Sequence, residues 1–455
     1  MSEEILQASG DVLIEKITIV SAIRGKYLDV LDYLVEVNLY ESIFSPTLTG
    51  SLTLSDSRNL IRDFPILGEE LLVLQVRTPT LDKELAISKT FRIHGIRDKK
   101  FARDGTTQLY TLSFCSVELF ADLHNPLYKG FEGKPEEVVT KIFNDYLKSP
   151  RNLTVDKTSD DTTTLLNILG KTDNTIKFVS PGWTPIQCIN WIASKSLSEN
   201  NTAANFLFWE TSKGFYFGNL HNVLQNSQMV NIGEYFYSES FVNTLNMGEG
   251  TYDTTDAAGR KMFGVKSLYV EEGFDQLRNN MSGYISNRLL DVNLYNKNYV
   301  IKDYDHGTSF KNYAHTEKGK VVPMFAESTT RNPLVYLKVN YSYPKLYGTD
   351  NNFDVVTKDI FGNRRSNLIE LNNYSMTIVI PGRTDIEVGS TIGINLPKGK
   401  PLQADDASTP GLDELYSGKY LITSITHTIN RKTHFATMNI NKDCFLEEAI
   451  NKLDT

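Results

Sequence analysis

Apolar residues alternate with polar ones at both ends of this chain, and that alternation restricts the chain to a mainly β fold. A period of two places apolar side chains on one face of a strand. The first group of alternating runs lies at 34–40, 50–55, 71–76, 91–94 and 109–115. The second group lies at 376–380, 392–396, 420–425 and 436–440. Turn residues separate the runs, so each group predicts an antiparallel barrel or sandwich.

The two groups match one another in order, which indicates an internal duplication. Segments 34–40, 51–54, 66–68, 91–93 and 110–114 resemble, in turn, 289–295, 377–380, 387–389, 420–422 and 436–440. The separation between matching segments increases by about 70 residues after the first pair, so the second copy contains an insertion. The segment 307–373, rich in Gly, Asn and charged residues, is the predicted insertion.

The middle of the chain has a different pattern and predicts a small α+β domain. Pro135 followed by two glutamates starts a helix that ends at Ser149-Pro150. Thr184-Pro185-Ile186-Gln187 has the form of a capping box and starts a second helix, which runs to about Leu197. Aromatic runs on either side of Lys213-Gly214 predict a hairpin.

The fold class is therefore mainly β with α+β insertions, and two similar antiparallel barrels are expected. The predicted domains are a first barrel at 1–124, an α+β domain at 125–225, a second barrel made of 226–306 and 374–455, and an insertion domain at 307–373. The Pro-, Gly- and Asp-rich stretch 397–418 is expected to be a long loop.

Composition argues against nucleic-acid recognition and secretion. Lys and Arg number 47 against 55 Asp and Glu, a formal charge of −8, whereas phosphate binding favours the opposite sign. The three cysteines, Cys115, Cys188 and Cys444, are far apart and form no disulfide framework, which fits folding in a reducing cytosol. No signal peptide and no membrane-spanning apolar run is expected.

Histidines and glycine-rich segments give no catalytic or ligand-binding motif. His427 and His434 could face each other across a hairpin, where a hydrogen-bonded strand histidine is favoured over a metal ligand. Gly170-Lys171-Thr172 ends like a phosphate-binding loop, but Leu165 stands where the first glycine is required.

Acidic and aromatic clusters have structural interpretations as well. The clusters 303–306 and 350–354 lack the spacing of a calcium loop and are interpreted as solvated turns. Trp209 and the run 215–217 are interpreted as core packing rather than as a stacking surface. No catalytic, cofactor-binding or metal-binding residue is assigned, although a carboxylate pair for sugar hydrolysis depends on three-dimensional separation and stays open.

Several segments together resemble the central hub protein of contractile-tailed (T-even-like) phage baseplates, and the base of the related type VI secretion spike. The segments that carry the resemblance are Tyr40–Ser45 with Gly50–Leu52, Thr184-Pro185 before the helix holding Trp191, Phe208–Phe215, Pro381–Ile386 and Ser417–Ile422. Residues 226–270 and 307–373 show the least likeness.

The resemblance implies a homotrimer whose two tube-like barrels per chain form a pseudo-six-fold ring. One end would meet the hexameric tail tube or tube-initiator proteins, and the other would hold a trimeric spike. The lumen would pass the tape-measure protein and then DNA, without sequence-specific binding, and an acidic chain suits such a channel. The location implied is the virion baseplate, assembled in the host cytoplasm, and no enzymatic residue or cofactor is implied.

Two other functions remain open from the sequence. A spike-base protein of a bacterial secretion or injection system would normally continue into a long needle, whereas this sequence ends at Thr455 soon after its last strand. A baseplate-associated hydrolase or carbohydrate binder would need a groove with paired carboxylates or aromatic residues.

Overall fold

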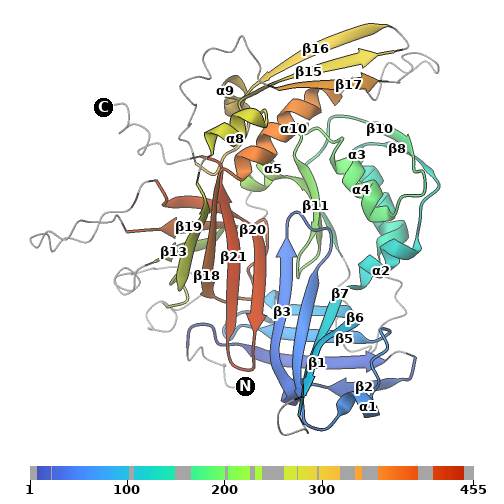
Figure 1. Cartoon of the computed structure of the whole chain (residues 1–455), viewed down its shortest axis with the longest axis vertical. Coiled ribbons are helices and arrows are strands. Elements are labelled where there is room, and N and C mark those ends of the chain that lie inside the picture. Colours follow the sequence, from blue (N-terminus) through green and yellow to red (C-terminus); the bar gives the residue numbers. More distant parts are fainter. Residues whose placement is uncertain are drawn as a thin grey trace, which may run out of the picture.

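A 13-stranded sheet dominates the structure and contains both strand-rich regions of the sequence (Figure 1). The structure, a computed structural model, describes residues 8–21, 23–101, 107–148, 165–199, 203–225, 231–237, 261–273, 275–294, 297–317, 334–340, 357–397, 413 and 415–444. None of the helices in these ranges has the length and apolar content needed to cross a bilayer.

The first half of the main sheet is formed by the N-terminal strands and encloses its own apolar core. Its strands are β1 (Leu13–Ser21), β2 (Lys26–Asp29), β3 (Leu34–Ser42), β4 (Thr49–Asp56), β5 (Leu71–Arg77), β6 (Ile87–Phe101) and β7 (Gln108–Ser116). Short helices connect them: η1 (Leu31–Tyr33), α1 (Leu60–Asp63), η2 (Lys83–Leu85) and, after β7, α2 (Val117–His124). All five predicted strands are present, and β1 and β2 are additional strands that the alternation did not reveal.

The second half of the main sheet is formed mostly by the C-terminal strands. They are β13 (Asn231–Phe236), β14 (Ser267–Glu272), β18 (Tyr374–Pro381), β19 (Thr391–Asn395), β20 (Gly418–Ile429) and β21 (His434–Lys442). The predicted loop 397–418 lies largely outside the described residues. The described pairings join both halves into one sheet and do not close either half into a separate barrel.

The two halves have the same strand order. The first half runs β3-β4-β7-β6-β5-β1, and the second runs β14-β18-β21-β20-β19-β13. Neighbours are antiparallel at every corresponding step except the last, where β1 is antiparallel to β5 but β13 is parallel to β19.

The two halves agree in the register of their strand pairs as well as in their strand order. Ile93 pairs with Phe114 and Ile422 pairs with Ile440, and in both halves the register shifts directly after the isoleucine. The isoleucine N–H donates to the carbonyl of Glu70 in the first half (3.0 Å) and of Ser390 in the second (2.9 Å). The matches proposed for 51–54, 91–93 and 110–114 therefore fall at equivalent positions in the sheet.

The match proposed between 34–40 and 289–295 is wrong. The strand that pairs with β18 as β3 pairs with β4 is β14, because Leu268 lies opposite Ile378 as Val37 lies opposite Leu52. Residues 289–293 belong instead to β15 in a separate three-stranded sheet. The two segments share alternation, which determines that a segment forms a strand but not which strand it pairs with.

The predicted insertion boundary at residue 307 also differs from the structure. Strands on both sides of it form one sheet, which projects from the end of the molecule opposite the first half with α10 packed beneath it (Figure 1). The elements between β14 and β18 are α8 (Gln276–Met281), β15 (Ser286–Asn293), β16 (Asn298–Asp305), α9 (His306–Ser309), η5 (Phe310–Asn312), β17 (Leu334–Asn340) and α10 (Thr357–Leu371). Residues 286–305 therefore form one sheet with 334–340 and, among the described strands, do not pair with the main sheet, and we name the elements from α8 to α10 the inserted unit.

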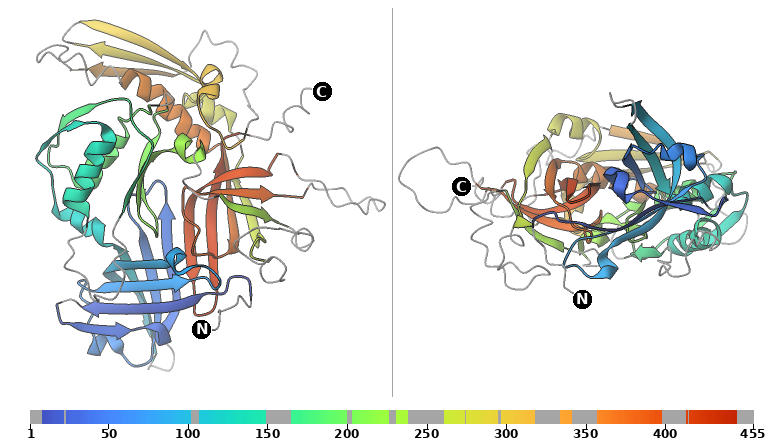
Figure 2. Two further views of the ribbon diagram at one scale, coloured as in Figure 1. Left: turned by 180° about the vertical axis from the view of Figure 1, so that it is seen from behind. Right: turned by 90° about the horizontal axis from the view of Figure 1, so that it is seen from below.

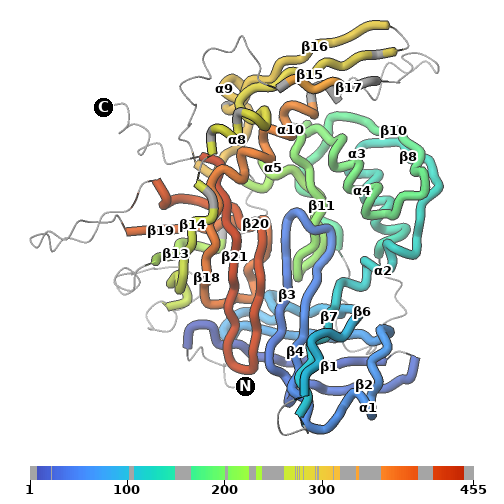
Figure 3. The backbone as a smooth tube through the Cα atoms, in the orientation of Figure 1, coloured from blue at the N-terminus to red at the C-terminus, as the bar shows by residue number. Residues whose placement is uncertain are grey.

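The two halves meet where β20 pairs antiparallel with β3, from Ser42–Ser424 to Val37–Ile429. These strands are far apart in sequence and lie side by side in the tube trace (Figure 3). Ile429 from β20 packs in the core of the first half, so the junction is apolar as well as hydrogen-bonded.

The α+β domain lies on the side of the molecule opposite β13 and β19 (Figures 1 and 2). Its elements are β8 (Gly130–Gly133), α3 (Pro135–Ile142), η3 (Phe143–Leu147), β9 (Leu166–Leu169), β10 (Ile176–Val179), α4 (Pro185–Ala193), β11 (Phe206–Glu210), β12 (Phe215–Asn219) and α5 (Leu220–Gln225). Thr184 and Gln187 form the predicted capping box. Helix α4 ends before the predicted Leu197, and the hydroxyls of Ser194 and Ser196 bond to carbonyls of its last turn.

Candidate functional site

His427 and His434 face each other across the β20–β21 hairpin, as the sequence suggested. Both rings are buried, and Nδ1 of His427 lies 3.0 Å from Nε2 of His434, so one ring donates to the other. Burial lowers the pKa of His427 to about 4 and holds that of His434 well below its usual range, so both rings are neutral at pH 7. A Cβ on Gly382 would overlap the His434 ring, which explains the glycine after Pro381.

The segment 170–172 makes structural contacts. Thr172 donates a hydrogen bond from its hydroxyl to the carboxylate of Glu136 on α3. Gly170 has a φ of +114°, and a Cβ there would meet the side chain of Asn222. The glycine thus lets two segments of the α+β domain approach closely.

The acidic cluster 303–306 is likewise held by neighbouring residues. Asp303 forms two hydrogen bonds with the Arg288 guanidinium, at 2.6 and 2.8 Å, and Asp305 accepts the N–H of Thr308 as the N-cap of α9. The second cluster, 350–354, lies outside the described residues.

The aromatic residues of the β11–β12 hairpin belong to cores on both of its faces. Four phenylalanines, Phe206, Phe208, Phe215 and Phe217, pack with the helices of the α+β domain. Trp209 and Tyr216 point to the other face, where their rings stack at 5.6 Å within the core of the second half.

The tip of this hairpin brings together buried polar residues from three parts of the chain. Glu210 is fully buried and accepts hydrogen bonds from the Leu48 N–H (2.7 Å), the Ser116 hydroxyl (2.5 Å) and the Lys89 ammonium. Burial alone would lower the pKa of Lys89, but the charges of Glu210, Glu118 and Glu41 and the hydrogen bond to Glu210 together outweigh it and raise that pKa. The ion pair therefore anchors the hairpin to the first half.

The same tip contacts two further carboxylates, Glu41 from the first half and Glu387 from the second. Glu41 on β3 accepts the N–H of Ser212 (2.8 Å) and of Val388 (3.4 Å). Glu387 accepts the hydroxyls of Thr211 (2.8 Å) and Tyr216 (3.1 Å). Burial, together with the charge of Glu387, raises the pKa of Glu41 to about 7. Segments that carry the family resemblance, 40–45, 208–215 and 381–386, thus meet at or beside one junction.

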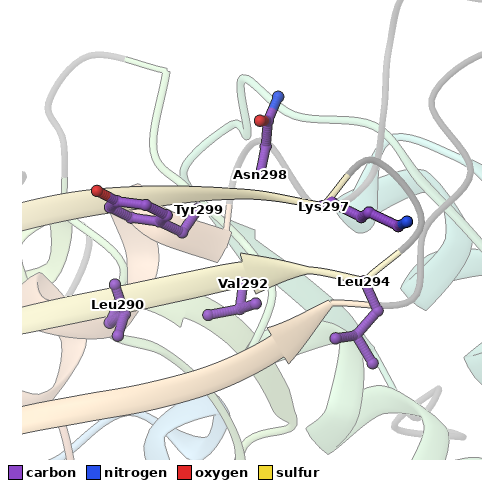
Figure 4. A pocket seen from close by; sticks show the side chains of 6 residues that line it. All are labelled: Leu290, Val292, Leu294, Lys297, Asn298 and Tyr299. Atoms are coloured by element: carbon purple, nitrogen blue, oxygen red, sulfur yellow. The ribbon is translucent and has the colours of Figure 1, made fainter.

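An exposed apolar face lies on the projecting sheet, away from α10. Strand pairing places Leu290 beside Ile301 and Leu337, and Val292 beside Tyr299, on the same side of the sheet. Figure 4 shows Leu290, Val292, Leu294 and Tyr299 near the β15–β16 turn. Tyr299 and Leu337 are each 67% exposed. We name Leu290, Val292, Leu294, Tyr299, Ile301, Val335 and Leu337 the outer apolar face. Contiguous apolar patches of this kind mark interaction sites.

The outer edge of β14 and one edge of the second part of β6 are among those in the main sheet with no partner among the described strands. β14 ends the sheet and pairs only with β18. β6 pairs with β5 only from Ile87 to Arg92, so its long second part, 94–101, pairs with β7 alone. Unpaired edges are templates for adding another strand. Alternation alone did not reveal either edge, because it carries no information on which strands are outermost.

No protein-family model and no curated protein sequence matches this chain. Solved structures do match its fold. A tail protein from Neisseria meningitidis MC58 has a TM-score of 0.50 at 10% identity, covering 94% of this chain and 96% of that one. The 43 kDa tail protein of prophage MuSo2 from Shewanella oneidensis has a TM-score of 0.50 at 9% identity, covering 94% and 99%.

A component of the E. coli type VI secretion system, described as similar to the T4 bacteriophage tail proteins gp27 and gp5, matches with a TM-score of 0.40 at 9% identity, covering 90% of this chain and 73% of that one. The chain thus has the fold of phage tail proteins over nearly its whole length. This agrees with the mainly β fold expected from the resemblance to the baseplate hub.

Proposed function

We propose that this chain is a non-enzymatic structural subunit of a contractile phage tail, a baseplate hub that works as a homotrimer. The observation that carries the proposal is the repeated strand order and register of the two halves of the main sheet. We attribute that repeat to an internal duplication, because an equal order of five antiparallel strands with the same bulge is improbable by chance.

The strand pairing that joins the two halves inside one chain indicates how neighbouring chains would pair. β20 pairs with β3 through residues 424–429, directly beyond its pairing with β19. The counterpart of β20 is β6, whose equivalent residues 95–101 lack a partner on that side. The counterpart of β3 is β14, which is also an edge. Pairing β6 of one chain with β14 of the next therefore repeats the internal junction between chains.

Charge supports this pairing. The free part of β6 carries three cations, Arg97, Lys99 and Lys100, and one acid, Asp98, all exposed, and Glu271 is exposed near the end of β14. Opposite charges on adjacent strands stabilise their pairing and bias the choice of partner. Each chain has one free β6 edge and one free β14 edge, so the contact is heterologous and can close into a ring.

Three chains joined in this way contribute six similar half-sheets. Such a ring adapts a six-fold tail tube, or its initiator proteins, to a three-fold spike. Its lumen would pass the tape-measure protein and then DNA, and the formal charge of −8 disfavours binding of phosphates along the way. The proposed location is the virion baseplate, after assembly in the host cytoplasm.

The outer apolar face provides a separate contact in this proposal. It lies on the inserted unit rather than on the free edges of the main sheet, so ring formation does not use its residues. We assign it to a contact with another baseplate protein.

The first test is the mass of the purified chain by light scattering, with negative-stain images of the same sample. A particle of three times 51.4 kDa with a central hole is expected. A strict monomer at high concentration, alone and with tail-tube and spike partners added, would overturn the proposal.

A disulfide cross-link tests the interface itself. Lys99→Cys and Tyr269→Cys in one chain place thiols on the two free edges, and mild oxidation should give covalent dimers and trimers. Tyr27→Cys with Tyr269→Cys is the matched control, since Tyr27 is also exposed but lies on β2. The native cysteines are buried and do not compete. Equal cross-linking by both pairs would argue against β6–β14 pairing.

A further inference from the structure

Three different ligand types for a metal ion meet where the inserted unit contacts the end of β21. His315 follows η5, and Asp443 and Cys444 follow β21 directly. One atom from each, a histidine nitrogen, a carboxylate oxygen and the cysteine sulfur, lie within 4.8 Å of one another. All three residues are nearly or fully buried, since the side chains of His315 and Asp443 are only 6% and 5% exposed and Cys444 is 1% exposed.

The His315 ring is oriented by a second partner. Its Nε2 lies 2.7 Å from the carbonyl oxygen of Phe310, and a carbonyl can only accept, so Nε2 carries a hydrogen. Its Nδ1 faces the Asp443 carboxylate at 2.8 Å. Metal-bound histidines use this arrangement, in which one ring nitrogen donates a hydrogen bond to a backbone carbonyl and the other nitrogen points to the metal.

Asp443 and Cys444 are also held in position. The N–H (3.0 Å) and hydroxyl (2.5 Å) of Thr316 both donate to Oδ1 of Asp443, which leaves Oδ2 directed at His315. The N–H of Glu317 lies 3.1 Å from Sγ of Cys444, and the thiol donates to the Glu317 carbonyl at 3.0 Å, so both backbone groups of Glu317 fix the position of Sγ. Burial alone would raise the pKa of Asp443, but hydrogen bonds from His315 and Thr316 and the charge of His315 hold it well below its usual range.

The surroundings of Glu370 give independent support for a bound cation at this place. This glutamate at the end of α10 is 1% exposed, and its Oε1 has no hydrogen-bond partner among the described residues. That oxygen lies 3.7 Å from Nδ1 of His315 and 3.3 Å from Nε2 of His306. Leaving a buried carboxylate oxygen without a partner costs about 1–3 kcal/mol or more, so a bound cation would relieve it.

We propose that His315 Nδ1, Asp443 and Cys444 form a zinc site, with Glu370 Oε1, 3.7 Å from Nδ1 of His315, as the candidate fourth ligand. Nitrogen, oxygen and sulfur donors in a four-ligand set match the preferences of Zn²⁺ and exclude Mg²⁺ and Ca²⁺, which take oxygen ligands. Zinc replaces the proton on the Cys444 thiol, together with any proton on Nδ1 of His315 or on Glu370, and these protons pass to solvent. No electron is transferred in this binding.

The site would fasten the inserted unit to the main sheet. Glu370 and His315 belong to the inserted unit, whereas Asp443 and Cys444 belong to the strand that pairs with β18 and β20. The site is independent of β6–β14 pairing, so it goes beyond the proposed function and does not depend on it.

The test uses the full-length chain with Zn²⁺ or Co²⁺ alone as the probe. We expect one Zn²⁺ per chain after dialysis, release of protons on binding, and a higher melting temperature with Zn²⁺ than with EDTA. Co²⁺ should give the thiolate charge-transfer band that reports a Co–S bond. If the folded wild-type chain retains no Zn²⁺ and shows no Co–S band, the proposal is wrong.

Variants locate the site. Cys444→Ser should remove the Co–S band and lower Zn²⁺ affinity by 10-fold or more, and Glu370→Gln should lower affinity while keeping the band. Cys188→Ser is the matched control, a buried free cysteine in the α+β domain, and should leave metal binding unchanged. If Cys444→Ser does not fold, the same band measured in the wild type and in Cys188→Ser decides, because loss of the band in Cys188→Ser would place the thiolate ligand elsewhere.

Discussion

Glu41 and Glu387 are buried carboxylates from opposite halves of the main sheet, and both accept hydrogen bonds from the tip of the β11–β12 hairpin. The hairpin belongs to the α+β domain, so one short turn connects three parts of the chain. Burial raises the cost of two like charges at this junction, and the arrangement is more favourable when Glu41 carries a proton.

Stability should therefore fall as the pH rises through the neutral range. The pKa of Glu41 is raised from 4.5 to about 7, so the folded state binds more protons than the unfolded state between these values. Glu41 should contribute its full stability below pH 4.5 and lose it progressively up to about pH 7. The loss should be about 3–4 kcal/mol, since the difference is about 2.5 pKa units at about 1.4 kcal/mol each. Urea unfolding across pH 5–8 measures it, and a Glu41→Gln chain should show a flatter dependence.

Removing Glu210 should destabilise the chain strongly, because Lys89 would stay buried without its main partner. Glu210→Gln should cost about 3–5 kcal/mol of unfolding free energy, and adding Lys89→Met should recover part of it. Lys177→Met is the control, since the Lys177–Glu132 pair is exposed and should be worth less than about 1 kcal/mol. Equal effects of Glu210→Gln and Lys177→Met in chemical unfolding would contradict the assigned role of Glu210.

Gly50 and Gly95 should respond oppositely to alanine. A Cβ on Gly50 would overlap the Phe114 ring and lie 2.6 Å from the Asn38 carbonyl oxygen, whereas a Cβ on Gly95 would meet nothing within 4 Å. Gly50→Ala should cost about 1–3 kcal/mol through overpacking, and Gly95→Ala should be neutral or slightly stabilising. Thermal unfolding of the two variants side by side is the measurement.

Excising the whole inserted unit should be tolerated better than excising the smaller segment that the sequence suggested. Glu272 on β14 lies opposite Ser375 on β18, so replacing 273–373 by a turn of about 2–4 residues converts these strands into a hairpin. Removing only 307–373 would leave β15 and β16 without β17 and α10, and this variant should aggregate. Solubility and circular dichroism compare the two, and aggregation of the larger excision alone would show that the unit is part of the core.

Charged residues on the outer apolar face should leave the subunit folded while weakening its contact with another protein. Tyr299→Lys with Leu337→Lys should reduce the fluorescence of an apolar-surface dye and the binding of baseplate partners, with little change in melting temperature. Tyr27→Lys serves as the control, because Tyr27 is 78% exposed on β2, away from this face. Unchanged partner binding in the double variant would remove this face from the assembly.

The alternating sequence pattern was sufficient to predict where most strands lie, but it was insufficient to predict which strands pair with each other. Alternation identified β4, β6 and β7 and their counterparts β18, β20 and β21, because one face of each is buried. The alternation led us to match β15, rather than β14, to β3. The sequence of β14, Ser267–Glu272, alternates less clearly, because Leu268 and Val270 are its only aliphatic residues. Partner choice depends on contacts between residues far apart in sequence, which a single alternating segment does not encode.

The buried polar groups were beyond sequence reasoning for the same reason. In the sequence Glu41, Glu210 and Glu387 look like ordinary strand or loop carboxylates, and they are buried only because three parts of the chain meet there. His315 and Asp443 are separated by 128 residues, so no spacing rule for metal ligands detects them. The capping box at Thr184, by contrast, is local and was predicted from four residues.

The pairing of β3 with β20 also has a mechanical consequence. It covers six residue pairs and continues the sheet without interruption from one half to the other. Bending at that seam would break backbone hydrogen bonds along its whole length, so the two halves respond to load as one stiff plate. In the proposed hub, an applied force would therefore pass through both halves together, and any yielding would occur in the attachments of the α+β domain and the inserted unit.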